Sequence, residues 1–187
     1  MTGDPGNPPP VRASGAAPVV VTATTGAADQ RFFDALRTAH YPPSRNRVAA
    51  HITLFHHLPP SVLDELARLI RAIVADTPPP VARVSDIYLL DRGVAFRVES
   101  PTLLEIRARI ADRFAGLLAA QDRGTPRLHI TVQNKADPAA ARKLLAELRR
   151  DFRARPLTIA GLAAHHYRDG LWETAFERNF RGMRGRY

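Results

Sequence analysis

Residues 51–54 read His-Ile-Thr-Leu, and a near copy, His-Ile-Thr-Val, occupies residues 129–132 in the second half of the chain. Both copies lie in short segments rich in β-branched and aliphatic residues, which favours strands. Side chains alternate along a strand, so the histidine and threonine of each copy are expected on one face and the aliphatic residues on the other. Each copy, here called a His-x-Thr motif, therefore predicts a strand that presents one imidazole and one hydroxyl group to a common surface.

The elements expected around the motifs follow the same order in both halves of the chain. Strands are expected over residues 19–24, 49–57, 81–90, 94–98, 127–134, 157–167 and 171–176. Helices are expected between them, with apolar stripes over residues 32–39, 62–73, 103–117 and 144–148. The order strand, helix, strand, helix, strand thus occurs twice, which predicts a duplicated lobe.

Three of the expected helices start at recognisable capping residues. Ser100 precedes a proline and Asp137 precedes another, which predicts a capping side chain followed by proline in the first turn. Ser61 and Asp64 form a capping-box pattern, which predicts a helix start at residue 61. These starts place a helix directly after each motif strand.

The length of 187 residues allows one good-sized domain or two small lobes. Residues 1–17 are rich in proline, glycine and small residues and are expected to form a flexible tail. Residues 18–180 are expected to form one domain, its lobes made from the repeats, about 18–91 and 92–180, and residues 181–187 a basic tail. An ordinary α/β domain with halves that match by chance is the alternative, and the paired motifs argue against it.

Composition excludes several classes of protein. The chain has no cysteine, which rules out disulfides, cysteine-based zinc sites and thiol catalysis and fits a cytoplasmic location. No apolar run approaches the roughly 20 residues of a transmembrane helix, so no membrane association is expected. The 27 basic and 18 acidic residues give a net charge of +9. This charge fits a polyanionic partner and fits a biased genomic base composition equally well.

The paired motifs carry a set of groups suited to cleaving a phosphodiester. If the two strands face one cleft, one histidine can take a proton from the attacking oxygen and the other can give one to the leaving oxygen. Two threonine hydroxyls can donate to the non-bridging oxygens. The scheme requires neither a metal ion nor a cofactor, and it predicts a bell-shaped pH dependence near neutrality. A single His-x-Thr is usually structural, so the prediction rests on the pair.

The paired motifs, in this order of elements, resemble those of the two-histidine phosphoesterase superfamily, in its bacterial branch of 2′-5′ RNA ligase-like proteins and cyclic phosphodiesterases. Residues 51–59 and 129–135 carry the resemblance, which extends over about 19–180. It implies a bilobal α+β fold with two antiparallel sheets, outer helices and a central cleft. It also implies metal-independent chemistry on 2′,3′-cyclic phosphates or 2′-5′ linkages. The residues that match the family motif, and that the resemblance implies are catalytic, are His51, Thr53, His129 and Thr131.

Further side chains are candidates for binding substrate. By alternation, Phe55, Gln133 and Arg127 share the face of the motif histidines, where they could stack on a base or bind phosphate. Tyr41 and Arg45 lie in the loop before the first motif and could reach the cleft from it. Packing at the sheet ends, or a solvated loop, is the alternative for these residues.

The remaining histidines do not predict a metal site. His56 is expected to point away from the motif face, and His57 lies too far along the strand from His51 to share an ion with it. His165 and His166 are adjacent on a strand and so diverge. These four are interpreted as surface or core residues, and Trp172 as a core residue.

The sequence therefore predicts a monomeric phosphoesterase that acts on RNA or on a nucleotide with a cyclic phosphate, using His51 and His129 as acid and base. The alternatives are 2′-5′ RNA ligation by the same groups and a non-catalytic RNA-binding module in which the histidines only hold phosphate. Which histidine is the acid, and which substrate is native, is left open by the sequence.

Overall fold

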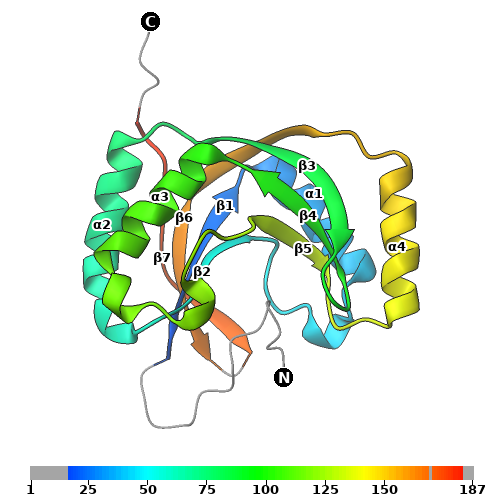
Figure 1. Ribbon diagram of the computed structural model, residues 1–187, viewed down its shortest axis with the longest axis horizontal. Coiled ribbons are helices and arrows are strands. Elements are labelled where there is room, and N and C mark those ends of the chain that lie inside the picture. The colour runs from blue at the N-terminus through cyan, green and yellow to red at the C-terminus, as the bar shows by residue number, and fades with distance from the viewer. Residues whose placement is uncertain (1–16, 169, 183–187) are drawn as a thin grey trace, which may run out of the picture.

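A computed structural model of the chain describes residues 17–168 and 170–182, in which seven strands and four α-helices form a curved sheet with helices outside it (Figure 1). The strands are β1 (Val19–Thr25), β2 (Ile52–Leu58), β3 (Val81–Leu89), β4 (Val94–Glu99), β5 (His129–Gln133), β6 (Arg155–Arg168) and β7 (Leu171–Asn179). The helices are α1 (Ala27–His40), α2 (Leu63–Asp76), α3 (Pro101–Arg113) and α4 (Pro138–Arg150). Each expected strand and helix is present, with ends that differ by a few residues.

Two of the three expected helix caps form. The Ser100 side chain accepts a hydrogen bond from the Leu103 amide at 3.3 Å, and Asp137 Oδ1 accepts from the Ala139 amide at 2.8 Å. The capping box at Ser61 is wrong, because Pro60 starts a 3-10 turn over Pro60–Val62 and α2 follows it without a side-chain cap. A proline with its fixed φ favours that turn over the extended conformation that a capping serine needs.

The seven strands form one antiparallel sheet in the order β1-β2-β5-β4-β3-β6-β7. The order closes on itself because β6 is long: residues 159–166 pair with β1 and residues 155–158 pair with β3. The predictions of an α+β fold and of antiparallel pairing are confirmed. The prediction of two separate sheets is wrong, since β6 joins the strands of both parts and β2 meets β5 at the pair Ile52–Ile130.

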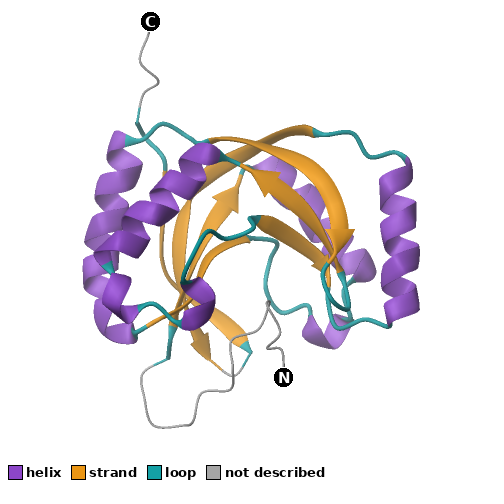
Figure 2. Cartoon of the chain, in the orientation of Figure 1, coloured by secondary structure: helices purple, strands orange, loops and turns teal. Residues whose placement is uncertain are grey.

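The two halves of the sequence contribute to both ends of the molecule. Helices α2 and α3 lie together at one end of the sheet, and α1 and α4 lie at the other (Figure 2). Strands β3 and β4, on either side of the expected boundary near residue 91, pair with each other as a hairpin. The division of the domain into two lobes, about 18–91 and 92–180, thus remains a prediction. The expected tails, residues 1–17 and 181–187, fall largely outside the described residues.

The core lies between the inner face of the helices and the sheet. Its largest fully buried side chains include Phe33 on α1, Leu66 and Ile70 on α2, and Ile106 and Ile110 on α3. Their spacing of three or four residues is that of one helix face. Burial of such stripes holds the helices against the sheet that carries the motif strands. Within the described residues, no helix is both long and apolar enough to span a bilayer.

Candidate active site

The sheet order brings the two His-x-Thr motifs together, because β2 and β5 are neighbours and Ile52 pairs with Ile130. These isoleucines, like Leu54 and Val132, are at most 1% exposed and point into the core. The alternating residues of the motifs line one cleft of about 90 Å³. The motif residues that line the cleft are His51, Thr53, His129 and Thr131. The predicted shared surface is thus present, with both imidazoles and both hydroxyl groups on it.

The two motif histidines are held in the same way. Nδ1 of His51 lies 2.7 Å from the carbonyl oxygen of Ala49, and Nδ1 of His129 lies 2.7 Å from that of Arg127. A carbonyl oxygen only accepts hydrogen bonds, so Nδ1 carries the proton in each ring. This fixes the tautomer and leaves Nε2 of each ring as the nitrogen that can exchange a proton with a bound molecule.

Both motif histidines have pKa values below the usual range of histidine. Burial is the main cause that lowers the pKa of His51 to about 3; the Ala49 carbonyl opposes it, and the nearby Arg37, His165 and His129 make smaller contributions in the direction of burial. Burial also lowers the pKa of His129 below its usual range, and the positive charges of His56 and Arg127 act in the same direction. Loss of hydration disfavours the charged imidazolium. At neutral pH both rings are therefore uncharged.

A buried arginine supports the floor of the cleft. Arg37 on α1 is 3% exposed, and its Nη1 donates to the Thr131 carbonyl oxygen at 2.8 Å. Its Nε donates to Asn46 Oδ1 at 3.1 Å, and its guanidinium lies 4.3 Å from the centre of the Tyr41 ring. Arg37 thus ties the second motif strand to the loop before the first, and it places a positive charge near His51.

Two of the expected substrate-binding residues are turned into the core instead of the cleft. Phe55 is fully buried, and Gln133 is 6% exposed and is not among the residues that line the cleft. The physical reason is a β-bulge one residue after each motif threonine. Thr53 pairs with Thr22 but Phe55 pairs with Val21, and Thr131 pairs with Ala95 but Gln133 pairs with Val94. The extra residue breaks the alternation and turns the next side chain inward.

Of the three other expected binding residues, two line the cleft. Tyr41 and Arg45, from the loop before the first motif, line it as expected. Arg127 does not line it. Its guanidinium lies 5.6 Å from the centre of the Tyr88 ring, which in turn contacts His129 edge-on at 6.3 Å between ring centres. Arg127 therefore lies outside the cleft, and its charge lowers the pKa of His129.

Several cleft residues were not predicted from the sequence. They are Arg37, Arg47, His56, Asn134, Tyr167 and Trp172. One of them had a signal: Arg37 follows Phe33 by four residues, so a charge stands on the apolar face of α1. The expected positions of His56 and Trp172 are wrong. The bulge returns His56 to the cleft, and the β6–β7 hairpin places Trp172 at its wall, 4.4 Å from His51 between ring centres.

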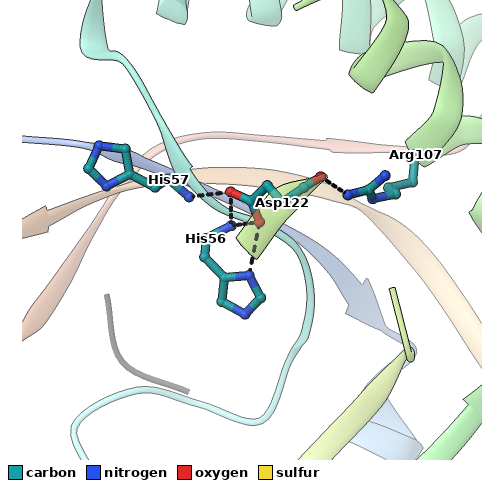
Figure 3. Close-up of polar contacts among 4 residues, drawn as sticks. All are labelled: His56, His57, Arg107 and Asp122. Atoms are coloured by element: carbon teal, nitrogen blue, oxygen red, sulfur yellow. Dashed lines mark hydrogen bonds and ion pairs between the residues drawn. The ribbon is translucent and has the colours of Figure 1, made fainter. Parts of the chain in front are cut away.

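A buried carboxylate holds His56. Asp122, in the 3-10 turn Ala120–Asp122, is 1% exposed and accepts hydrogen bonds from the His56 amide at 2.9 Å and the His57 amide at 2.9 Å. Its Oδ1 also lies 3.0 Å from His56 Nδ1. Arg107 donates to its backbone carbonyl oxygen (Figure 3). The ring of His56 turns Nδ1 toward the carboxylate, whereas the ring of His57 lies on a different side and only its backbone amide contacts Asp122 (Figure 3).

A second, larger hollow adjoins the cleft. It has a volume of about 410 Å³ and shares Tyr41, Arg45, Arg47 and Asn134 with the cleft. Lys135 also lines it, so three cationic side chains face this space. Across residues 17–168 and 170–182, no group of three or more His, Asp or Glu side chains is placed to hold a metal ion.

A family model and several solved structures match the chain. The model described as the 2′-5′ RNA ligase superfamily matches residues 26–171, which include both motifs. No curated protein shows significant similarity to the sequence.

The crystal structure of TT0787 of Thermus thermophilus has a TM-score of 0.59 at 14% identity, with coverage of 89% of this chain and 100% of that chain. E. coli LigT complexed with 3′-AMP has a TM-score of 0.58 at 15% identity, with coverage of 88% of this chain and 98% of that chain. E. coli LigT complexed with NADP+ has a TM-score of 0.56 at 15% identity, with coverage of 89% of this chain and 99% of that chain. These likenesses show that the fold is shared over nearly the whole of each protein.

Proposed function

We propose that this chain is a metal-independent phosphoesterase. The premise is that the chain belongs to the 2′-5′ RNA ligase superfamily. The resemblance to the two-histidine phosphoesterases is confirmed by that membership, which supports an activity of the phosphoesterase or ligase type. The reaction we propose is the hydrolysis of a 2′,3′-cyclic phosphate, or of a 2′-5′ phosphodiester, in RNA or a nucleotide. The observation that carries the proposal is the equivalent placement of His51 and His129 in one cleft, each with Nδ1 held by a carbonyl oxygen.

In the proposed reaction the two histidines exchange protons through Nε2. One ring, uncharged, takes a proton from a water molecule as the water oxygen attacks phosphorus. The other ring, protonated, gives its Nε2 proton to the ribose oxygen as the P–O bond breaks. The product is a phosphate monoester beside a free hydroxyl group, and the two rings have exchanged roles. The fixed tautomers support this scheme because neither ring must rotate to present Nε2.

The hydroxyl groups of Thr53 and Thr131 would stabilise the negative charge that grows on the non-bridging oxygens in the transition state. Arg37 would add a positive charge beside His51 and, through the Thr131 carbonyl, keep the second motif strand in place. Entry of the phosphate anion would raise the lowered pKa of both histidines, because a nearby negative charge favours imidazolium. Substrate binding would thus charge the acid that the reaction needs.

The two hollows support a substrate made of a phosphate and a nucleoside. The inner cleft, about 90 Å³, holds the motif residues and would take the phosphate. The adjoining hollow, about 410 Å³, is lined by aromatic and cationic side chains and would take the nucleoside or the next phosphate along RNA. E. coli LigT, with which the fold is shared, has been crystallised with 3′-AMP, a nucleotide of this kind.

Ligation is the second candidate, favoured by the description of the family. The same groups would act in reverse, with a 5′-hydroxyl group in place of water as the nucleophile. Hydrolysis stands first because water is in large excess over a 5′-hydroxyl end.

The experiment that tests the proposal is incubation of EDTA-treated protein with three substrates, followed by identification of the products. The substrates are a 2′,3′-cyclic mononucleotide, an RNA oligomer that ends in a 2′,3′-cyclic phosphate, and a 2′-5′-linked dinucleotide. We expect a phosphate monoester from at least one of them. Joining of the RNA oligomer to a 5′-hydroxyl acceptor would favour ligation, and binding of RNA without any product would favour the non-catalytic interpretation.

A further inference from the structure

His56 stands in the cleft as a third histidine that the two-histidine scheme does not use. It lies on β2 three residues after Thr53, where strict alternation would point it into the core. The bulge at Leu54 and Phe55 turns it back, and its side chain is 25% exposed and lines the cleft with His51 and His129. The second motif strand has the same bulge, and its equivalent residue, Asn134, lines the cleft as well.

The Asp122 carboxylate fixes the orientation of the His56 ring. Oδ1 lies 3.0 Å from Nδ1, and a carboxylate only accepts hydrogen bonds, so Nδ1 carries a proton. The two backbone amides that also donate to Asp122, those of His56 and His57, hold the carboxylate in place. Because Asp122 takes Nδ1 and the side chain lines the cleft, Nε2 is the ring nitrogen left for a molecule in the cleft.

The surroundings of His56 favour a bound anion. In the protonated state its ring carries a positive charge close enough to lower the pKa of His129. The buried Asp122 carboxylate compensates the positive charge of the His56 ring at Nδ1 only. Arg107, which donates to the Asp122 carbonyl, adds positive charge on the buried side. An anion in the cleft would complete a row of carboxylate, imidazolium and phosphate with alternating charge.

We propose that His56 and Asp122 form a phosphate-binding position of the cleft, in which His56 Nε2–H donates to a phosphate oxygen on the side of His129. His56 acts here as a binding residue and Asp122 as its positioning residue. The inference rests on the proposed function for the identity of the ligand, and it deepens it by adding a third imidazole to the phosphate site. It does not require His56 to transfer a proton in the reaction.

The test separates this role from a structural one with two substitutions at neighbouring positions. In His56→Asn the amide nitrogen can still donate to Asp122, in place of Nδ1, but the nitrogen that faces the cleft is lost. His57→Asn is the matched control, because its ring lies on the other side of Asp122 and does not line the cleft. Binding of inorganic phosphate and of adenosine 3′-phosphate is measured by calorimetry, alongside kcat, KM and thermal unfolding.

We expect His56→Asn to bind both phosphates about 10- to 100-fold more weakly than the wild type, the loss usual for one charge-assisted hydrogen bond. KM should rise by a similar factor while kcat changes less than about threefold, and Tm should match that of His57→Asn. His56→Gln, which can place an amide nitrogen near the position of Nε2, should recover part of the binding.

Phosphate binding by His56→Asn within about twofold of the wild type would overturn the proposal, as would equal loss in His56→Asn and His57→Asn with a lowered Tm. A wild-type protein that binds neither phosphate compound would overturn the proposed function itself. The binding readout distinguishes the two failures, because it does not depend on turnover.

Discussion

The indole ring of Trp172 lies 4.4 Å from the imidazole ring of His51, centre to centre. The same indole stacks on His165 at 5.2 Å, so Trp172, from the far end of the chain, covers two histidines at one wall of the cleft. This cover contributes to the burial that lowers the pKa of His51 to about 3 and that of His165 to about 4. The contact links the β6–β7 hairpin to the pKa of the first motif histidine.

The pH profile of kcat/KM should have its maximum below pH 6.5. This ratio reports the free protein, in which the pKa of His51 is about 3 and that of His129 is also lowered, so the acid form of the pair exists only at acidic pH. The maximum of kcat should lie at higher pH, because bound phosphate raises the pKa of both rings. Initial rates measured from pH 4 to 9 give both profiles.

The substitution Trp172→Ala provides the internal check on this prediction. Removal of the indole exposes His51 to water, so its pKa should rise toward the usual value and the kcat/KM maximum should move to higher pH. A wild-type maximum above pH 7, or a flat profile between pH 5 and 8, would contradict the lowered pKa values.

The free energy of unfolding should fall as the pH drops from about 7 to 5. The pKa values of His51 and His165 are about 3 and about 4 in the folded protein, against about 6.5 in the unfolded chain. In this window the unfolded chain binds more protons than the folded protein, and acid therefore favours unfolding. Urea unfolding at pH 7, 6 and 5 measures the slope. His165→Gln should have a shallower slope, and an unchanged slope would exclude His165 as a contributor.

Removal of either motif hydroxyl group should slow turnover without unfolding the protein. Thr53→Val and Thr131→Val keep the branched shape that suits a strand but lose the donor to the non-bridging oxygens. We expect kcat to fall roughly 100-fold in each, the usual effect of losing one such donor. Thr158→Val, an exposed position on β6, is the control and should keep wild-type kcat. Wild-type kcat in both motif variants would remove the threonines from the mechanism.

Arg37→Ala should destabilise the fold by about 2–4 kcal/mol, because it leaves the Thr131 carbonyl and the Asn46 side chain without their buried donor. Arg31→Ala, on the exposed face of the same helix, should change stability by less than about 0.5 kcal/mol. Urea unfolding of the three proteins measures the difference. Equal stability of Arg37→Ala and Arg31→Ala would show that the Arg37 hydrogen bonds contribute nothing to the folded state.

The positions of the motif residues could be predicted because they depend on local geometry. A histidine and a threonine two residues apart share a face of any regular strand, and the burial of Ile52 and Ile130 agrees with that rule. The same rule failed at Phe55 and Gln133, because a bulge is a property of two paired strands. One strand's sequence does not reveal where its partner's register shifts.

The rest of the cleft depends on contacts between segments that are remote in sequence. Trp172 reaches His51 only because β6 pairs with β1 and carries β7 beside it. His56 acquires its orientation from Asp122, in a turn more than sixty residues away along the chain. Such relationships follow from the closed order of the sheet, which neither motif alone determines.

The most direct test of the two-histidine account is turnover of a 2′,3′-cyclic nucleotide by EDTA-treated wild type, His51→Ala and His129→Ala, with circular dichroism to verify folding. The account predicts wild-type activity that survives EDTA and that falls at least about 100-fold in each folded variant. Activity that EDTA abolishes, or that persists in either folded variant at more than about a tenth of the wild-type rate, would contradict it.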